Sequence, residues 1–228
     1  MNKHIEFDCE KRRHFLMELY NRLEDTNGQT NWWPADTPFE VCIGAILTQN
    51  APWRGVVKSI NNLKENRIFD VHIIADTPEQ ILAKAIRPSI YYNQKAKKLK
   101  TFCRFLLERY KGKIENMAGQ DMLEARKTLL ALPGIGCETA DSILLYALGM
   151  PVFVVDAYTR RIFTRHGLID PNWDYENIRN FFEEALEPDV GLYGEFHALI
   201  CLLGANYCKR NPGCDNCPAK EIMGEPVL

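Results

Sequence analysis

Apolar residues recur at intervals of three and four along nearly all of this 228-residue chain, a spacing typical of α-helices that bury one face. Over residues 8–26, for example, Phe15, Leu16, Leu19 and Leu23 fall on one side of a helix. Short breaks rich in Gly or Pro separate such segments, and residues 151–155 form a brief extended apolar stretch. The sequence therefore predicts an all-α protein.

Composition narrows the class of protein. Hydrophobic residues make up 46% of the chain and charged residues 25%, which suits a folded protein with a real core. No apolar run reaches the roughly 18 residues of a membrane span, and the charged start of the chain does not resemble a secretory leader. We therefore expect a cytoplasmic monomer that makes no membrane contact. Its eight cysteines are expected to be free thiols or metal ligands.

The distribution of charge is more informative than its sum. The net charge of -2 does not indicate a nucleic-acid partner. However, residues 84–113 contain ten Lys or Arg residues and a single acid, Glu108. Such one-sided charge can form a phosphate-binding face, and the alternative is an ordinary solvated helix surface.

A glycine-rich turn, Leu132-Pro-Gly-Ile-Gly136, joins two predicted helices. Its glycines allow a tight hairpin and a close approach to another surface. The unpaired amides that open the second helix could then hold an anion such as a DNA phosphate. An ordinary connection between two helices explains the same residues equally well.

Asp156 follows four apolar residues and begins a further predicted helix, twenty residues after Gly136. Asp is a preferred N-cap residue, so a purely structural role is one interpretation. A carboxylate at this place could also stabilise an oxocarbenium-like sugar or activate a water molecule. The hairpin that precedes it favours the catalytic interpretation.

Four of the eight cysteines fall in the last 28 residues, in the order Cys201-x6-Cys208-x5-Cys214-x2-Cys217. Cys201 and Cys208 are seven residues apart, so we expect them to share a helix face. Four thiolates can hold an iron–sulfur cluster or a zinc ion, and the spacing alone does not choose between them. Free thiols are the simpler alternative.

The hairpin, the Val-Asp at a helix start and the terminal cysteines together resemble the helix-hairpin-helix DNA glycosylases (the HhH-GPD superfamily) typified by endonuclease III. The resemblance covers about residues 32–217. It implies two lobes: a six-helix barrel over 31–150, ending in the hairpin, and a second lobe from 1–30 and 151–228. It also implies a catalytic role for Asp156. The residues expected to contact DNA are Gly134, Ile135, Gly136, Lys95, Lys97 and Arg160.

Two departures from that family pattern matter. Bifunctional members carry a lysine nucleophile two residues after the second hairpin glycine, where this chain has Glu138. A carboxylate cannot form a Schiff base, so we expect base removal without strand cleavage. The family's last cluster cysteine has no counterpart after Cys217, and Cys201 is expected to replace it. The resemblance implies a 4Fe-4S cluster, with zinc as the alternative.

Within the superfamily, the segments around Trp32-Trp33-Pro34 and Leu47-Thr-Gln-Asn50 resemble the bacterial 3-methyladenine DNA glycosylases. That resemblance implies a base pocket lined by Trp32, Trp33 and Trp53, with Gln49 and Asn50 near the gap left by the flipped base. The tryptophans could instead simply pack between lobes.

The expected function is thus monofunctional removal of an alkylated purine from double-stranded DNA in base excision repair. Alternatives are a glycosylase for mismatched, deaminated or oxidised bases, a bifunctional lyase that uses another lysine, and a non-catalytic lesion sensor.

Overall fold

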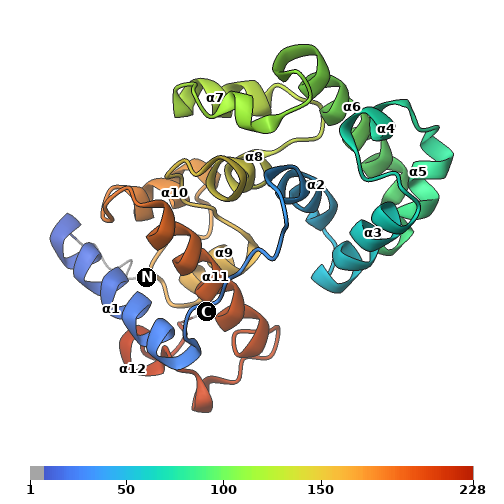
Figure 1. The fold of residues 1–228 in the computed structure, drawn as a ribbon. Coiled ribbons are helices and arrows are strands. Elements are labelled where there is room, and N and C mark those ends of the chain that lie inside the picture. The colour runs from blue at the N-terminus through green and yellow to red at the C-terminus, as the bar shows by residue number, and fades with distance from the viewer. Residues whose placement is uncertain (1–7, 228) are drawn as a thin grey trace. The chain divides into compact units, whose positions relative to one another are not determined.

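The computed structural model describes residues 8–227, and every regular element in that range is a helix (Figure 1). This confirms the predicted all-α class. The chain forms two compact units. The central unit comprises Trp33–Met150, and the terminal unit combines Met1–Trp32 with Pro151–Leu228. No helix among the described residues is long and apolar enough to cross a membrane.

The central unit is built around α2, which is buried continuously from Val41 to Leu47. Thr37 caps this helix, and Pro38 occupies its first turn, where a missing N–H costs nothing. Helices α3, α6 and α8 pack against α2. The helices of the unit are α2 (Pro38–Thr48), α3 (Trp53–Glu65), α4 (Val71–Asp76), α5 (Glu79–Ala85), η1 (Arg87–Ser89), α6 (Tyr92–Tyr110), η2 (Ile114–Met117), α7 (Met122–Leu130), α8 (Cys137–Ser142) and the π-helical turn η3 (Ile143–Ala147).

The terminal unit is organised around the apolar helix α11, against which α1 and α9 pack. Its helices are α1 (Cys9–Asn27), α9 (Ala157–Arg165), α10 (Tyr175–Glu183), α11 (Val190–Asn206), η4 (Cys214–Asn216) and α12 (Lys220–Met223). Helices α9 and α11 approach so closely that a Cβ at Gly204 would lie 2.3 Å from Cδ1 of Tyr158. Only glycine fits there, and this contact fixes the start of α9 beside α11.

Aromatic side chains form the core of the terminal unit. Phe153 lies in the extended stretch before α9, and its ring stacks on Phe182 with centroids 4.0 Å apart. Phe163 and Phe196 contact Phe182 edge to face. The apolar residues 152–155, read from the sequence as an extended stretch, are therefore buried backbone that carries the chain to Asp156.

Two elements differ from expectation. The short helix α4 was not predicted, because six residues give too little periodicity to detect. Helix α11 ends at Asn206, and Tyr207 and Cys208 both donate their N–H groups to the carbonyl of Leu203. Cys208 therefore lies beyond the helix, and the prediction that it shares a helical face with Cys201 is wrong.

Candidate functional site

The hairpin of the central unit joins α7 to α8. Gly134 has a φ of 86°, a conformation that glycine adopts without strain. Ile135 is buried and anchors the turn, whereas Gly136 is exposed and forms the N-cap of α8 without a side-chain hydrogen bond to cap it. Glu138 lies in the first turn of α8 and is exposed.

Gln49, predicted to lie near the base pocket, contacts the hairpin. Its Nε2 donates to the carbonyl of Gly134 at 3.0 Å and to Oγ1 of Thr139 at 2.8 Å. Lys98 donates to the side-chain oxygen of Gln49. The amide therefore ties the end of α2 to both sides of the turn. Asn50, next along the chain, is exposed with a φ of 50°, which Asn tolerates better than most residues.

Trp33 and Trp53, two of the residues predicted to line the base pocket, lie together in the central unit. Their rings meet nearly at right angles with centroids 5.6 Å apart. The ring of Tyr146, which no sequence pattern indicated, has its centroid 5.0 Å from that of Trp33. Trp53 is 39% exposed, so this aromatic cluster presents open ring surface. Trp32 belongs to the other unit and is half-buried.

Asp156 is the N-cap of α9, as the structural interpretation expected. Its Oδ1 accepts hydrogen bonds from the N–H of Thr159 at 2.7 Å and from the Thr159 hydroxyl at 2.8 Å. Its Oδ2 accepts from the thiol of Cys201 at 3.2 Å. Donors therefore fix both oxygens of a half-buried carboxylate.

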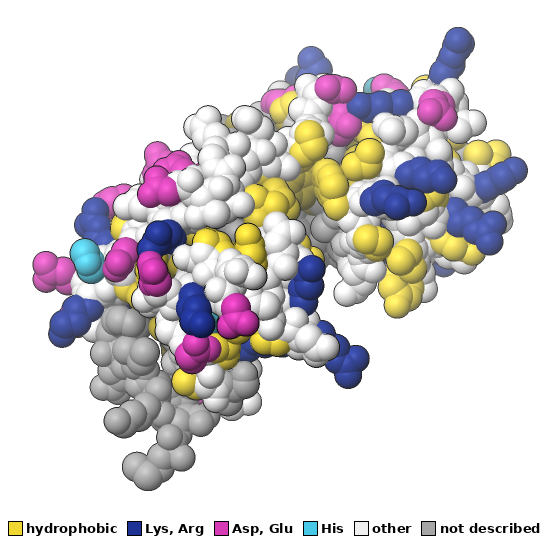
Figure 2. Space-filling view, turned by 90° about the horizontal axis from the view of Figure 1, so that it is seen from below, with side chains coloured by type: hydrophobic (Ala, Val, Ile, Leu, Met, Phe, Trp, Pro, Cys, Tyr) yellow, Lys and Arg dark blue, Asp and Glu magenta, His cyan; other side chains and the backbone are white. Residues whose placement is uncertain are grey.

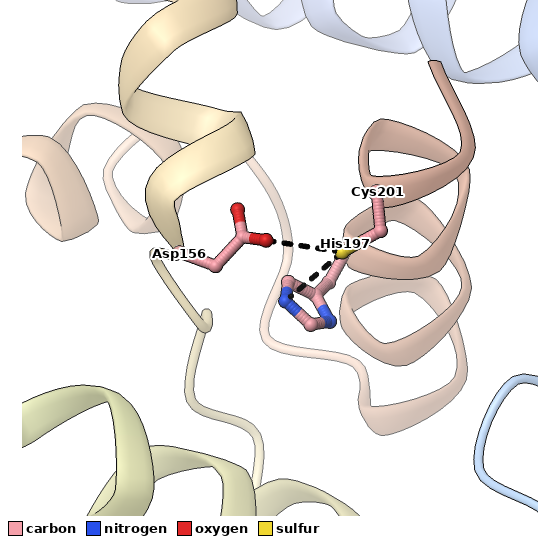
Figure 3. A group of neighbouring side chains, drawn as sticks. All are labelled: Asp156, His197 and Cys201. Atoms are coloured by element: carbon pink, nitrogen blue, oxygen red, sulfur yellow. Dashed lines mark hydrogen bonds between the residues drawn. The ribbon is translucent and has the colours of Figure 1, made fainter. Parts of the chain in front are cut away.

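His197 and Cys201 extend from successive turns of α11 toward Asp156 (Figure 3). The sulfur of Cys201 lies 3.6 Å from Nε2 of His197, and the three ligand-type atoms all lie within 4.8 Å of one another. Burial lowers the pKa of His197, so its ring is neutral near pH 7. The four-residue spacing of His197 and Cys201 placed them on one helix face, but nothing in the sequence joined that face to Asp156.

The four predicted metal ligands are not brought together. Cys208, Cys214 and Cys217 line one pocket, whereas Cys201 is not among its lining residues and contacts Asp156 instead. The structure therefore contradicts the prediction for Cys201, because its sulfur contacts Asp156 at the start of α9, whereas the sulfur of Cys208 contacts Arg165 at the end of that helix. His166 lines the cysteine pocket and was missed, since a single histidine gives no pattern in sequence.

Only part of the basic stretch over residues 84–113 is exposed and able to contact DNA. Lys95 is 2% exposed, and its Nζ donates to the carbonyl of Leu47 at 2.7 Å and to that of Ser89 at 2.5 Å. Lys95 therefore satisfies buried backbone groups, and its assignment as a DNA contact is wrong. Burial, reinforced by the charge of Lys98, lowers the pKa of Lys95 to about 8.

Other basic residues of the stretch remain exposed on the central unit: Lys84, Arg87, Lys97, Arg104, Arg109, Lys111 and Lys113. Figure 2 shows Lys and Arg side chains over the part of the molecule that α3 to α6 occupy in Figure 1. In the terminal unit, Arg160 is half-buried and donates to the carbonyl of Trp173 at 2.6 Å.

These features define a helical protein with a helix-hairpin-helix in one unit and a buttressed aspartate at a helix start in the other. Residues 43–188 match the HhH-GPD superfamily of base excision DNA repair proteins. The chain belongs to this superfamily and is, in general class, a DNA repair glycosylase.

Among its relatives, the protein MJ1434 of Methanocaldococcus jannaschii, provisionally named a DNA repair glycosylase, is 45% identical over 93% of this chain and 97% of its own length. Endonuclease III of Rickettsia conorii is 32% identical over 80% of this chain and 82% of its own. These matches extend along most of the chain.

Solved structures agree with this assignment. The 3-methyladenine DNA glycosylase of H. pylori, bound to 1,N6-ethenoadenine, matches with a TM-score of 0.73 and 32% identity over 85% of this chain and 97% of that one. An endonuclease III–DNA complex matches with a TM-score of 0.80 over 96% and 97% of the two chains. At 22% identity, the second match shows the shared fold alone.

Proposed function

We propose that this protein is a monofunctional DNA glycosylase that hydrolyses the N-glycosidic bond of an alkylated purine, chiefly 3-methyladenine, flipped out of double-stranded DNA. The observation that carries this proposal is the hydrogen-bonded carboxylate of Asp156 at the start of α9. An N-cap alone needs one acceptor oxygen for the backbone, whereas here the second oxygen also has a dedicated buried partner.

Asp156 suits the chemistry of base release. As the base departs, positive charge develops on the sugar, and a fixed carboxylate stabilises that charge without reorganising. The same group can orient a water molecule or accept its proton. Thr159 and Cys201 hold the carboxylate in place, and neutral His197 adds no competing positive charge.

The absence of an amine at position 138 supports hydrolysis over strand cleavage. Glu138 occupies the first turn of α8, and a carboxylate cannot form a Schiff base with the sugar. In this proposal water is the nucleophile, and an abasic site is the product.

The aromatic cluster of Trp33, Trp53 and Tyr146 supports the choice of substrate. 3-Methyladenine attached to the sugar is cationic, so aromatic faces attract it and its glycosidic bond is already weak. The H. pylori relative is itself named for 3-methyladenine. Asn50 is proposed to fill the gap left by the flipped base.

DNA binding is proposed to use the hairpin, Lys97 and Arg160. The backbone amides at the start of α8 would contact phosphate oxygens, and Lys97 would add a charge contact from the exposed side of α6. These contacts position the duplex and carry no base specificity of their own.

The decisive test replaces Asp156 by Asn, which is an equally good N-cap. Base release under single-turnover conditions should fall roughly a hundredfold to a thousandfold, with DNA affinity retained. Asp174→Asn is the matched control, because Asp174 caps α10 in the same unit through the N–H of Asn177. If the protein were a non-catalytic lesion sensor, the wild type would bind DNA without releasing any base. Equal rates of base release by Asp156→Asn and Asp174→Asn would refute catalysis by Asp156.

Substrate and reaction type are tested with duplexes that each carry one defined lesion. Prompt release of 3-methyladenine supports the proposal, whereas release of only a mismatched, deaminated or oxidised base contradicts the substrate assignment. Borohydride added during turnover should trap no protein–DNA adduct. A trapped adduct would reveal a lysine nucleophile and a bifunctional enzyme.

The cofactor proposed from the family resemblance is a 4Fe-4S cluster, with zinc as the alternative. Three thiols facing one pocket are suitable ligands for either. When bound, the metal would cross-link the C-terminal segment. All of the proposed chemistry at the sugar comes from protein side chains and water.

A further inference from the structure

One ring nitrogen of His166 is fixed by a backbone carbonyl. This residue is the C-cap of α9, and it lines the same pocket as Cys208, Cys214 and Cys217. Its Nδ1 lies 3.2 Å from the carbonyl oxygen of Met223. Because a carbonyl can only accept, Nδ1 carries the proton, and the lone pair of the neutral ring remains on Nε2. Histidine ligands in metal sites are commonly oriented by a hydrogen bond of this kind.

Arginines of α9 hold the first cysteine segment beside His166. Arg165 donates to the sulfur of Cys208 at 3.3 Å and to the carbonyl of Arg210 at 3.1 Å. Arg161 donates to the carbonyl of Cys208 at 2.8 Å. These two arginines therefore fix both the sulfur and the backbone carbonyl of Cys208.

The second cysteine segment folds as a tight turn. Cys217 donates its N–H to the carbonyl of Cys214 at 3.1 Å within the CxxC sequence. Lys220 donates its N–H to the carbonyl of Cys217 at 3.1 Å, and both cysteines line the pocket. The turn therefore supplies two thiols to the pocket that His166 also lines.

Cys201 has a different environment. Its sulfur lies between Asp156 and His197, and its side chain is 3% exposed. To become a ligand with the other three cysteines, it would have to leave both partners.

We propose that the metal centre of this protein is held by Cys208, Cys214, Cys217 and His166, and that Cys201 is a positioning residue for Asp156. Three thiolates and one imidazole form a complete four-ligand set for a zinc ion and can equally ligate the four irons of a cluster. The proposal concerns the metal ligands only, and it does not depend on which base the enzyme removes.

The test measures metal content of the full-length protein, purified without oxygen, by elemental analysis and visible absorption. His166→Ala and Cys214→Ala should each lower bound metal by about tenfold or more. Cys201→Ala should keep the wild-type content. His72→Ala is the matched control, because His72 is exposed on the central unit. Metal loss in Cys201→Ala together with full retention in His166→Ala would overturn the proposal.

A measurement on the wild-type protein identifies the ligands directly and does not depend on the folding of any variant. If iron is found, pulsed EPR of the reduced cluster should show hyperfine coupling to a histidine nitrogen. If zinc is found, X-ray absorption should fit three sulfurs and one nitrogen at about 2.3 and 2.0 Å. Four sulfur ligands, or no bound nitrogen, would refute the assignment of His166. A His166→Cys variant should bind metal again with a spectrum typical of four sulfur ligands.

Discussion

The carboxyl group of Asp156 caps α9 and is also the group proposed to act on the sugar. Oδ1 caps α9 through Thr159, which ties the side chain to the helix that it begins. Oδ2 is fixed from another element, by Cys201 of α11. The cap contact fixes Oδ1 and the thiol contact fixes Oδ2, so together they restrict rotation about the side-chain bonds of Asp156. The carboxylate is therefore already oriented before DNA binds.

Removing the thiol should therefore slow catalysis without affecting substrate binding. We expect Cys201→Ala to lower the rate constant for base release about tenfold, the effect of losing one hydrogen bond to a charged group, with KM unchanged. Cys201→Ser should recover most of the rate. Cys103→Ala, which removes another buried thiol, is the control. A Cys201→Ala variant as fast as Cys103→Ala would show that the thiol does not position Asp156.

Lys95 gives a second prediction about a single residue, which concerns how the free energy of unfolding depends on pH. Its folded pKa of about 8 lies below the ordinary 10.5, so between these values the unfolded chain binds more protons. The free energy of unfolding should therefore rise with pH, by about 1 kcal/mol from pH 8 to pH 9. Urea titrations at both pH values should show this gain in the wild type relative to Lys95→Met. Parallel changes in the two proteins would contradict the lowered pKa.

At the scale of elements, the long amphipathic helices could be predicted because apolar spacing reports directly on a buried face. Helix ends were harder to predict. The end of α11 at Asn206 depends on two amides that bond back to Leu203, and this moved Cys208 away from the face of Cys201. The contacts of Gln49 with Gly134 and Thr139 join residues more than eighty positions apart, and no local pattern reports such a contact.

The hairpin allows a prediction about an element. We expect Gly134→Ala to cost about 1–2 kcal/mol in the free energy of unfolding, because alanine is strained at a φ of 86° and its Cβ would lie 2.5 Å from Cε of Lys98. DNA affinity should fall as well, because the turn would shift. Gly119→Ala is the control, since no atom lies within 4 Å of the added Cβ and its φ is ordinary. Thermal melts and DNA titrations would measure both effects, and equal stability of the two variants would exclude strain at Gly134.

At the scale of the whole molecule, the terminal unit is held together by contacts between segments that lie far apart in the sequence. Glu195 of α11 accepts hydrogen bonds from the N–H and the hydroxyl of Thr30, at 2.7 and 3.0 Å. Arg22 of α1 pairs with Glu221 of α12. Helix α9 runs from Asp156 to the capping residue His166, and α11 carries Cys201 and leads to Cys208. Two helices thus connect the carboxylate to the proposed metal centre.

Removing the proposed metal should therefore loosen the terminal unit and leave the central unit intact. After chelation, amide hydrogen exchange should rise first over residues 207–227, then at the end of α9 and in α1, which contacts α12. Exchange over residues 33–150 should stay unchanged, because that unit has its own core around α2. The rate of base release should fall only in proportion to the rise in exchange in α9, because the metal takes no part in the proposed chemistry. An even rise in exchange across both units would show that the metal stabilises the protein as a whole. Unchanged exchange over residues 207–227 would show that the cysteine pocket folds without any metal.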